Sequence, residues 1–234
     1  MEIRMDGRVA LITGGSKGLG YAMGLKFAES GAQIALAART DAEVTDAALR
    51  IAQASGQKAI GYVCDVADAE AIKRLHQAVI TDFERIDILV NNAGFAKAGL
   101  FESITDDEWQ YDLDLKLMAA VRLSRLVLPS MKANRWGRII NMLNTLAKTP
   151  TKGSAPTSIT RAAGMALTKV LAGEGAAHNV LVNALNIGRI ESDQMVRAHK
   201  GSGSNDSLEA FIEAAGQWMQ GLTSGFYEGF ERII

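Results

Sequence analysis

Shortages of cysteine, of net charge and of long hydrophobic runs limit the classes of protein to which this sequence can belong. The chain has one cysteine, Cys64, in 234 residues, so it cannot form an internal disulfide, and we expect a cytoplasmic protein. The formal net charge is −1 and no long run of Lys or Arg occurs, so neither nucleic acid nor a membrane is expected as a partner. No apolar run approaches the roughly 18 residues of a membrane span, and the first residues lack a signal peptide's apolar stretch.

Histidine is also scarce, with three in the chain. His76, His178 and His199 share no metal-ligand spacing with acidic residues, so we predict no metal site.

Apolar residues make up 48% of the chain, enough for a sizeable core, and they alternate between short runs and longer amphipathic stretches. The short runs predict strands at residues 8–13, 33–38, 58–66, 86–94, 137–143 and 180–185. The amphipathic stretches predict helices ending near residue 30 and over 41–55, 68–83, 106–133 and 155–178. Near-continuous apolar strands separated by helices predict one doubly wound α/β domain, whose parallel sheet is covered on both faces.

Glycines separate the first predicted strand from the first predicted helix, in the stretch TGGSKGLG from Thr13 to Gly20. Such glycines let the backbone bend sharply and approach a pyrophosphate closely. The helix that follows directs N–H groups and a partial positive charge at the same place. The pattern indicates dinucleotide binding, and the alternative is a tight turn without a ligand.

Two basic residues near this turn bear on the choice of dinucleotide. Lys17 lies within the glycine turn, and Arg39 follows the second strand, where an acidic residue would bind the free ribose 2′-hydroxyl of NAD. A guanidinium can instead hold a 2′-phosphate with paired hydrogen bonds. We therefore predict NADP as the cofactor, with NAD less favoured; the alternative is that both residues are solvated surface cations.

The glycine turn, CDV at residues 64–66 and NNAG at residues 91–94 together resemble the short-chain dehydrogenase/reductase family over about residues 8–192. The resemblance implies a Rossmann-like fold and an oxidoreductase activity. It implies that the turn holds the pyrophosphate, that residues 65 and 66 contact adenine, that the NNAG segment lies on the adenosine side, and that a segment near residue 188 brackets the nicotinamide. The cofactor-binding positions that follow are Gly14, Ser16, Lys17, Gly18, Leu19, Gly20, Arg39, Asp65, Val66, Asn91, Ala93, Gly94, Arg161, Gly188 and Ile190.

The resemblance also implies four active-site positions, which this family fills with Asn, Ser, Tyr and Lys. In LDLKL the Asn position holds Lys116, and in NMLN the Ser position holds Asn144. The Tyr and Lys positions hold Thr157 and Arg161. All four differ from the family's pattern.

The threonine has the largest chemical consequence. A phenol has a pKa near 10 that a nearby ammonium can lower, whereas an alcohol has a pKa of about 15 to 16. The difference corresponds to about 7–8 kcal/mol of driving force for proton transfer. Arg161 stays protonated, so it can hold ribose hydroxyls but cannot shuttle protons.

The residues at the other two positions, Asn144 and Lys116, can still take part in a reaction. Asn144 can donate a hydrogen bond to a substrate carbonyl. Lys116 is titratable, and burial can bring the pKa of a lysine towards 7. We therefore predict an NADP(H)-dependent oxidoreductase that interconverts a carbonyl and an alcohol on a small organic substrate, with Lys116 or a water handling the proton. The alternative is a catalytically inactive nucleotide-binding protein of the same family.

The end of the chain has a weaker pattern. We predict a single domain over residues 1–234, with a family-like core at 1–192 and a lid helix and atypical tail at 193–234. Within the tail, residues 207–220 predict a helix, and we find no pattern for the family's C-terminal strand. Family habit implies a homodimer or homotetramer that pairs through residues 109–132 and 155–178. The substrate cannot be deduced from these residues.

Overall fold

The computed structural model describes residues 4–95, 97–188, 196, 199–201, 203, 205–207 and 210. The chain divides into two compact units, Met1–Asn186 and Ile187–Ile234, and the first holds every element discussed below except the last residue of its final strand. The predicted boundary at residue 192 and the single-domain organisation stay predictions. The helix predicted over residues 207–220 falls almost wholly outside the described residues, and so does the rest of the tail beyond it.

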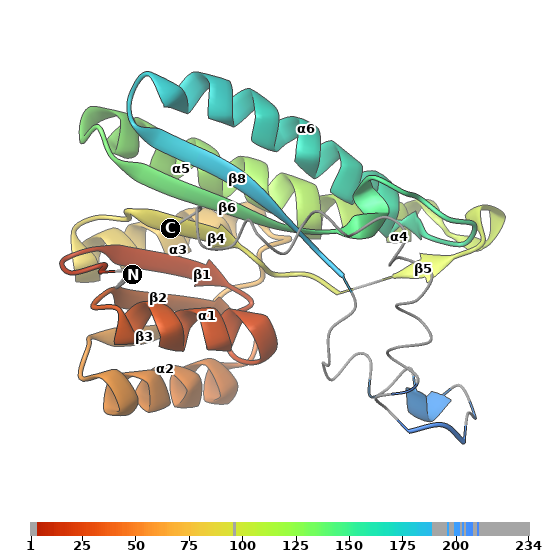
Figure 1. Cartoon of the computed structure of the whole chain (residues 1–234), viewed down its shortest axis with the longest axis horizontal. Helices are drawn as coiled ribbons and strands as arrows, with labels where there is room; N and C mark the ends of the chain where they lie inside the picture. Colours follow the sequence, from red (N-terminus) through yellow and green to blue (C-terminus); the bar gives the residue numbers. More distant parts are fainter. Residues whose placement is uncertain are drawn as a thin grey trace. The chain divides into compact units, whose positions relative to one another are not determined.

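A parallel sheet of six strands forms the centre of the first unit, in the order β3-β2-β1-β4-β6-β8 (Figure 1). The strands are β1 (Val9–Thr13), β2 (Gln33–Ala38), β3 (Ala59–Val63), β4 (Ile88–Asn91), β6 (Gly137–Asn144) and β8 (Val180–Ile187). The strand order reverses between β1 and β4. In open parallel sheets, ligands bind beyond the carboxyl ends of the strands at such a reversal, and the glycine turn lies at that place.

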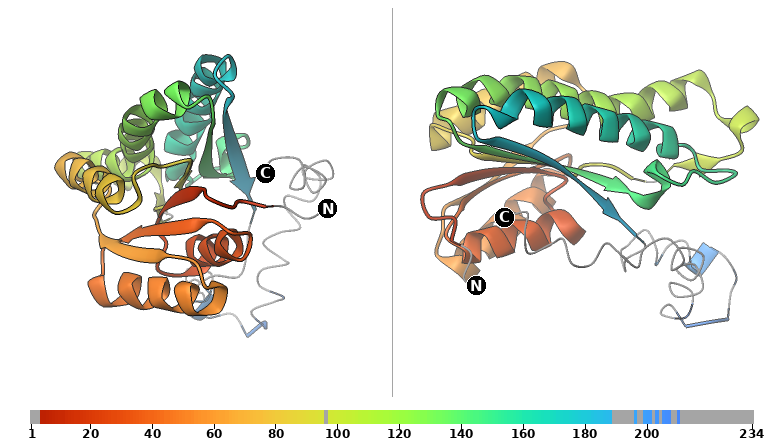
Figure 2. Two further views of the ribbon diagram at one scale, coloured as in Figure 1. Left: turned by 90° about the vertical axis from the view of Figure 1, so that its left-hand side faces the viewer. Right: turned by 45° about the horizontal axis from the view of Figure 1, so that its top comes forward.

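Helices cover both faces of the sheet, as predicted (Figures 1 and 2). One face carries α1 (Gly18–Glu29) and α2 (Asp41–Ser55), and the other carries α3 (Ala69–Phe83), α5 (Ala119–Ala133) and α6 (Thr157–Ala176). On the second face, apolar side chains of these helices pack with β1, β4 and β6 into one buried cluster that includes Cys64. None of the described helices is long and apolar enough to cross a membrane.

The predicted helix over residues 106–133 is not one α-helix. It begins as α4 (Asp106–Leu113), whose start is fixed by a capping box between Thr105 and Glu108, and passes through a π-helical segment, η2 (Asp114–Met118), into α5. At the end of η2 the N–H of Ala119 donates to the carbonyl of Asp114, five residues earlier. The wider turn places Lys116 within it, and single π-helical turns of this kind are frequent at functional sites.

The helix predicted over residues 155–178 begins two residues later than expected. Ala155–Pro156 forms a short strand, β7, which pairs antiparallel with β5 (Ala98–Gly99). Proline disfavours a helical conformation in the residue before it, so the helix cannot extend back through Ala155. This pairing holds the loop after β4 against the first turn of α6.

Short elements and strand ends complete the description. The 3-10 turns are η1 (Phe101–Ser103) and η3 (Thr145–Ala147). The predicted strands over 58–66 and 86–94 were too long, because residues 58, 64–66, 86–87 and 92–94 lie outside β3 and β4.

Candidate active site

The glycine turn is tied to the NNAG segment by side-chain hydrogen bonds at the carboxyl ends of β1 and β4. The Thr13 hydroxyl accepts from the N–H groups of Asn92 and Ala93, each at 3.0 Å. The Asn92 amide donates to the carbonyls of Thr13 at 2.9 Å and Gly14 at 3.2 Å. A Cβ on Gly20 would lie 2.2 Å from the Gly14 carbonyl oxygen. Only glycine therefore allows α1 to start this close to the turn.

The start of α1 is open towards ligands. Gly18 has φ +57°, and a Cβ there would meet no atom within 4 Å. Lys17 occupies the N-cap position and makes no side-chain capping hydrogen bond. The first N–H groups of α1 thus have no side-chain acceptor among the described residues. Ser16 lies in the turn and Leu19 in the first turn of α1; their role in binding the cofactor stays a prediction.

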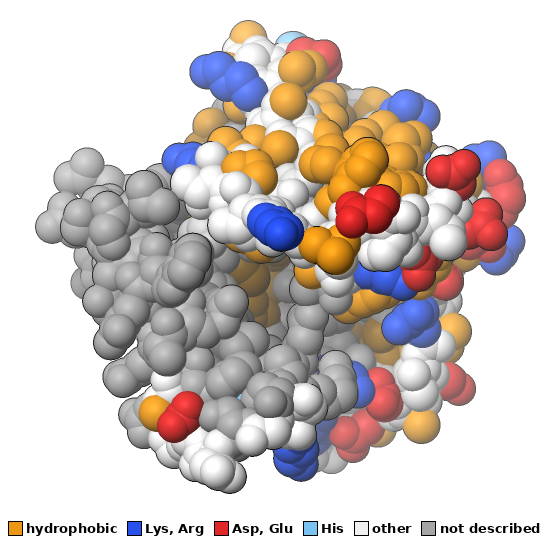
Figure 3. Space-filling model, turned by 90° about the vertical axis from the view of Figure 1, so that its right-hand side faces the viewer, with side chains coloured by type: hydrophobic (Ala, Val, Ile, Leu, Met, Phe, Trp, Pro, Cys, Tyr) orange, Lys and Arg blue, Asp and Glu red, His pale blue; other side chains and the backbone are white. Residues whose placement is uncertain are grey.

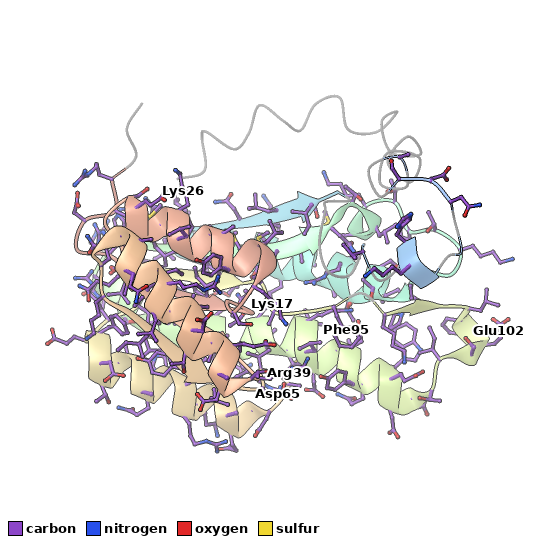
Figure 4. All side chains as sticks on the ribbon, turned by 90° about the horizontal axis from the view of Figure 1, so that it is seen from below. Lys17, Lys26, Arg39, Asp65, Phe95 and Glu102 are labelled. Carbon is purple, nitrogen blue, oxygen red and sulfur yellow. The ribbon has the colours of Figure 1, made fainter. Side chains whose placement is uncertain are left out.

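Lys17, Arg39 and Asp65 gather at one end of α1 and α2 (Figure 4). Lys17 Nζ lies 3.1 Å from Glu43 Oε1, and Arg39 Nη1 donates to the Tyr111 hydroxyl at 3.3 Å. Asp65 Oδ1 accepts from the N–H of Ala67 at 3.0 Å. The three contacts are single and mostly exposed, so the charged groups can turn towards a nucleotide. Val66, beside Asp65, is buried.

Lys116 and Thr157 are in direct contact in the interior. Lys116 Nζ donates to Thr157 Oγ1 at 2.7 Å and to Asp112 Oδ1. The Thr157 hydroxyl donates in turn to the Lys97 carbonyl at 2.6 Å, and the Thr160 hydroxyl donates to Asp112 Oδ2 at 2.7 Å. We call Asp112, Lys116, Thr157 and Thr160 the buried quartet; it joins α4 and η2 to the first turn of α6.

Burial decides the acidity of the lysine. The Lys116 side chain has an exposed fraction of 0%, and this desolvation lowers its pKa to about 8. The Asp112 carboxylate opposes the shift by favouring the charged form, and the Arg161 guanidinium reinforces it by repulsion. The Lys116 ammonium also faces the Phe95 ring, 5.7 Å from its centroid. The result is a buried acid whose pKa lies close to neutral pH.

Arg161 lies beside this group, one turn along α6 from Thr157. Its Nη1 donates to the Met142 carbonyl at 2.7 Å, and a Cβ on Gly94 would lie 2.8 Å from its Nη2. Desolvation lowers the Arg161 pKa to about 10, so the group is still a cation at neutral pH. It therefore presents a fixed positive charge against the backbone of the NNAG segment.

Three amide oxygens at the carboxyl ends of the strands are buried without a hydrogen-bond partner among the described residues. They belong to Asn91 at the end of β4, Asn144 at the end of β6 and Asn186 near the end of β8; Arg161 Nε is in the same condition. Asn91 keeps its amide nitrogen on Asn141 Oδ1 at 2.8 Å. Buried polar groups usually find partners, so these atoms mark a place where a ligand or a water would complete the bonding.

A cavity of about 260 Å³ opens beside the buried quartet, lined by Phe95, Lys97, Asp107, Glu108, Tyr111 and Asp112. The rings of Phe95 and Tyr111 lie 6.1 Å apart and form its aromatic side. Asp112 belongs to both the cavity and the quartet. In the part of the chain that the structure describes, no group of three His, Cys, Asp or Glu side chains is placed to hold a metal.

The structure brings Lys116 and Thr157 into contact and sets Arg161 beside them, whereas no hydrogen bond joins Asn144 to any of the three among the described residues. Gly188 is exposed after β8, and Ile190 lies outside the described residues. The sequence interpretation missed Asp112, Thr160, Asn92 and Tyr111. For Asp112 a signal existed, because residues four apart on a helix lie on one face and Asp112 and Lys116 carry opposite charges.

The chain is similar to many known proteins. Residues 8–202 match the short chain dehydrogenase family. The 3-oxoacyl-[acyl-carrier-protein] reductase of Aquifex aeolicus is 34% identical over 193 residues, which are 82% of this chain and 78% of that protein.

Solved structures show the same likeness. L-sorbose reductase from Gluconobacter frateurii, complexed with NADPH and L-sorbose, superposes with a TM-score of 0.88 at 31% identity, covering 93% of this chain and 84% of that one. An NAD⁺-bound xylitol dehydrogenase superposes with a TM-score of 0.80 at 28% identity, covering 92% and 84% of the two chains.

Proposed function

Since the chain belongs to the short-chain dehydrogenase/reductase family, whose members are NAD(P)-dependent oxidoreductases acting on small substrates, we propose that it interconverts a carbonyl and an alcohol with NADP(H). The observation that carries the proposal is the hydrogen bond from Lys116 to Thr157 at 2.7 Å. It supplies an acid at the position where the family places its tyrosine.

The geometry at the start of α1 and at the strand ends supports the proposal that the chain binds a dinucleotide. Gly18 leaves open space at an uncapped helix start, where free N–H groups suit a pyrophosphate. The unpartnered amide oxygens of Asn91, Asn144 and Asn186 lie at the strand ends, where the polar edge of a nicotinamide and its ribose would find partners. When bound, the cofactor supplies or accepts the hydride.

The preference for NADP(H) rests on Arg39 and Lys17. Related structures hold NADPH in one case and NAD⁺ in another, so the choice depends on this chain's own charges. To contact a nucleotide, Arg39 would break one long hydrogen bond, which its Nη1 donates to the Tyr111 hydroxyl at 3.3 Å. A guanidinium released from it can form charge-assisted bonds to a 2′-phosphate.

In the proposed proton route, the proton comes from Lys116 and passes through Thr157, so the weak acidity of a lone threonine does not limit the reaction. When a substrate carbonyl is reduced, the Thr157 O–H bond breaks as the new substrate O–H bond forms. At the same moment Thr157 takes a proton from the Lys116 ammonium, which becomes a neutral amine. The thermodynamic donor is then a group with a pKa of about 8, so the gap of about 7–8 kcal/mol expected for a lone threonine does not arise.

Arg161 and Asn144 would act on the bound molecules without exchanging protons. The Arg161 guanidinium, held by the Met142 carbonyl, offers its remaining N–H groups to ribose hydroxyls. The Asn144 amide can donate its N–H to the substrate oxygen and stabilise the charge that develops there.

A second candidate function is nucleotide binding without turnover. The Thr157 hydroxyl donates to the Lys97 carbonyl at 2.6 Å, away from any substrate, and the Lys116 ammonium already has Asp112 as its counter-ion. Both groups are buried. If the Thr157 hydroxyl never leaves the Lys97 carbonyl, the chain binds the cofactor and transfers no hydride.

Stopped-flow measurement of NADPH absorbance with a panel of small ketones and ketoses separates the two functions. The oxidoreductase proposal expects a substrate-dependent loss of NADPH in a single turnover. Tight NADPH binding without any oxidation across the panel would support the binding function. If neither NADP(H) nor NAD(H) raises the melting temperature, both candidates fail.

We also propose that the chain forms a homodimer through α5 and α6. Ile159 and Val170 on α6 are large apolar residues that are exposed, at 48% and 58%. A further group of exposed hydrophobic side chains lies at the end of the first unit that carries β5 (Figure 3), where Leu100 and Phe101 are exposed at 48% and 69%; it lies outside both helices of the proposed interface. Sedimentation of the Ile159→Glu/Val170→Glu variant should show a monomer where the native chain sediments as a dimer, and an unchanged sedimentation coefficient would contradict this.

A further inference from the structure

Asp112 carries a carboxylate that is buried between α4 and α6, with a side-chain exposed fraction of 3%. Its Oδ1 accepts from the Lys116 ammonium and its Oδ2 accepts from the Thr160 hydroxyl at 2.7 Å. The Asp112 carboxylate is thus bonded to both elements that supply the proposed proton route. Its Oδ1 bonds to Lys116 on η2, and its Oδ2 bonds to the first turn of α6.

The charges around Lys116 show what Asp112 counters. Arg161 of α6 repels the ammonium, and the Phe95 ring on the loop after β4 offers only a weak attraction at 5.7 Å. Lys97 and Glu108, which line the neighbouring cavity, are paired with each other. Asp107, also at that cavity, is exposed. Among the described residues, Asp112 is the carboxylate that bonds to Lys116.

We propose that Asp112 is a positioning residue that holds the Lys116 ammonium against Thr157 and keeps Lys116 in its acid form. A buried ammonium without a counter-ion loses its proton more readily, because burial disfavours the charged form. Without Asp112, Lys116 would face Arg161 alone and would reach neutral pH as an amine. The inference rests on the proposed function, since it assigns the residue that keeps the proposed proton donor charged.

The test measures the protonation of Lys116 directly, without relying on turnover. The full chain is labelled with ¹³Cε-lysine, and the Lys116 resonance is assigned by its loss in Lys116→Met. Its pH titration is then compared between the native chain and Asp112→Asn, which keeps the side chain's shape and removes the charge. We expect the pKa of Lys116 to fall by at least one unit in Asp112→Asn, and any pH limit on ketone reduction to move by the same amount.

Asp114→Asn is the matched control, because it removes a carboxylate two residues further along the same helix. The Asp114 carboxylate accepts from Arg122 at 2.7 Å and from Gln110 at 2.7 Å, and among the described residues it has no hydrogen bond or ion pair with the buried quartet. The pKa of Lys116 should stay within experimental error of its native value in this variant. A merely structural contribution of Asp112 would change the melting temperature and leave the Lys116 titration in place.

An unchanged Lys116 titration in a folded Asp112→Asn chain would overturn the proposal. If Asp112→Asn does not fold, Asp112→Ser, which leaves room for a water beside Lys116, is titrated in its place with the same expectation and the same contrary result. A downward shift in a chain that reduces no ketone at any pH supports the positioning role and rejects the proposed function. The two can therefore fail separately.

Discussion

Lys116 and Thr157 lie 41 residues apart in the sequence and share a hydrogen bond of 2.7 Å in the interior of the protein. The contact exists because the π-helical turn η2 projects Lys116 inward and the β5–β7 pairing fixes the first turn of α6. In the proposed mechanism, an alcohol that receives its proton from an ammonium would take the place of the family's phenol. Activity would then depend on both residues together.

Replacing Thr157 with valine tests the alcohol's part in the relay. Valine keeps the shape and removes the hydroxyl, so Lys116 loses its path to the substrate oxygen. The rate of ketone reduction should fall by about 10²–10⁴, the range typical of general acid catalysis, while the Kd for NADPH changes little. Thr157→Ser should retain most of the rate; equal rates in the valine and serine variants would show that the hydroxyl carries no proton.

The direction of the pH dependence follows from the lowered pKa of Lys116. Reduction needs the ammonium form, which is present below a pH of about 8 and is lost above it. Oxidation of the alcohol needs the amine form, so its rate should rise through the same range. When each kcat/KM profile is scaled to its own maximum, the two should cross near that pH; profiles that are flat from pH 6 to about pH 9 would remove Lys116 from the mechanism.

Arg39→Ala tests the choice of cofactor. Loss of charge-assisted bonds worth about 1.5–3 kcal/mol should raise the Kd for NADPH by about 10- to 100-fold and leave the Kd for NADH almost unchanged. Lys26→Ala is the control, because Lys26 lies at the other end of α1 (Figure 4) and pairs with Glu29 at 3.0 Å. Equal losses of NADPH affinity in both variants would indicate a general charge effect.

The buried pair of Asp112 and Lys116 should also contribute measurably to the free energy of unfolding. Lys116→Met alone leaves the Asp112 carboxylate buried without its cation, which typically costs about 3–5 kcal/mol. The double variant Asp112→Leu/Lys116→Met removes both charges and should recover most of that loss. Urea unfolding of the four chains in the cycle gives the coupling between the two residues, and additive losses would mean that they do not act as a pair.

Much of the fold was accessible from the sequence, because buried parallel strands and amphipathic helices leave strong local patterns. The bounds of β2 and α2 were predicted to the residue. The helix predicted over residues 68–83 is α3, with Asp68 at its N-cap, where the Asp68 side chain accepts from the N–H of Glu70. The π-helical turn and the β5–β7 pairing were missed. Both depend on contacts between distant segments, which local periodicity does not record.

The candidate site, like the fold, could be predicted from the sequence only in part. The glycine turn and the altered positions could be found from motif and resemblance, because they occur at fixed spacings. The spacing of Asp112 and Lys116 was a signal for their pairing, but the bond between Asp112 and the Thr160 hydroxyl could not be predicted, since it joins α4 to α6 in the interior. Lys116 also lies within the π-helical turn η2, which the sequence pattern did not predict.

The most direct test of the account is the rate of a single turnover of NADPH oxidation by a small ketone, compared between the native chain and Lys116→Met across pH. The account predicts a native rate that is constant at low pH and declines above about pH 8, and a Lys116→Met rate that is lower by about 10²–10⁴ and shows no such decline. A variant that reduces the ketone as fast as the native chain, with the same pH profile, would contradict it.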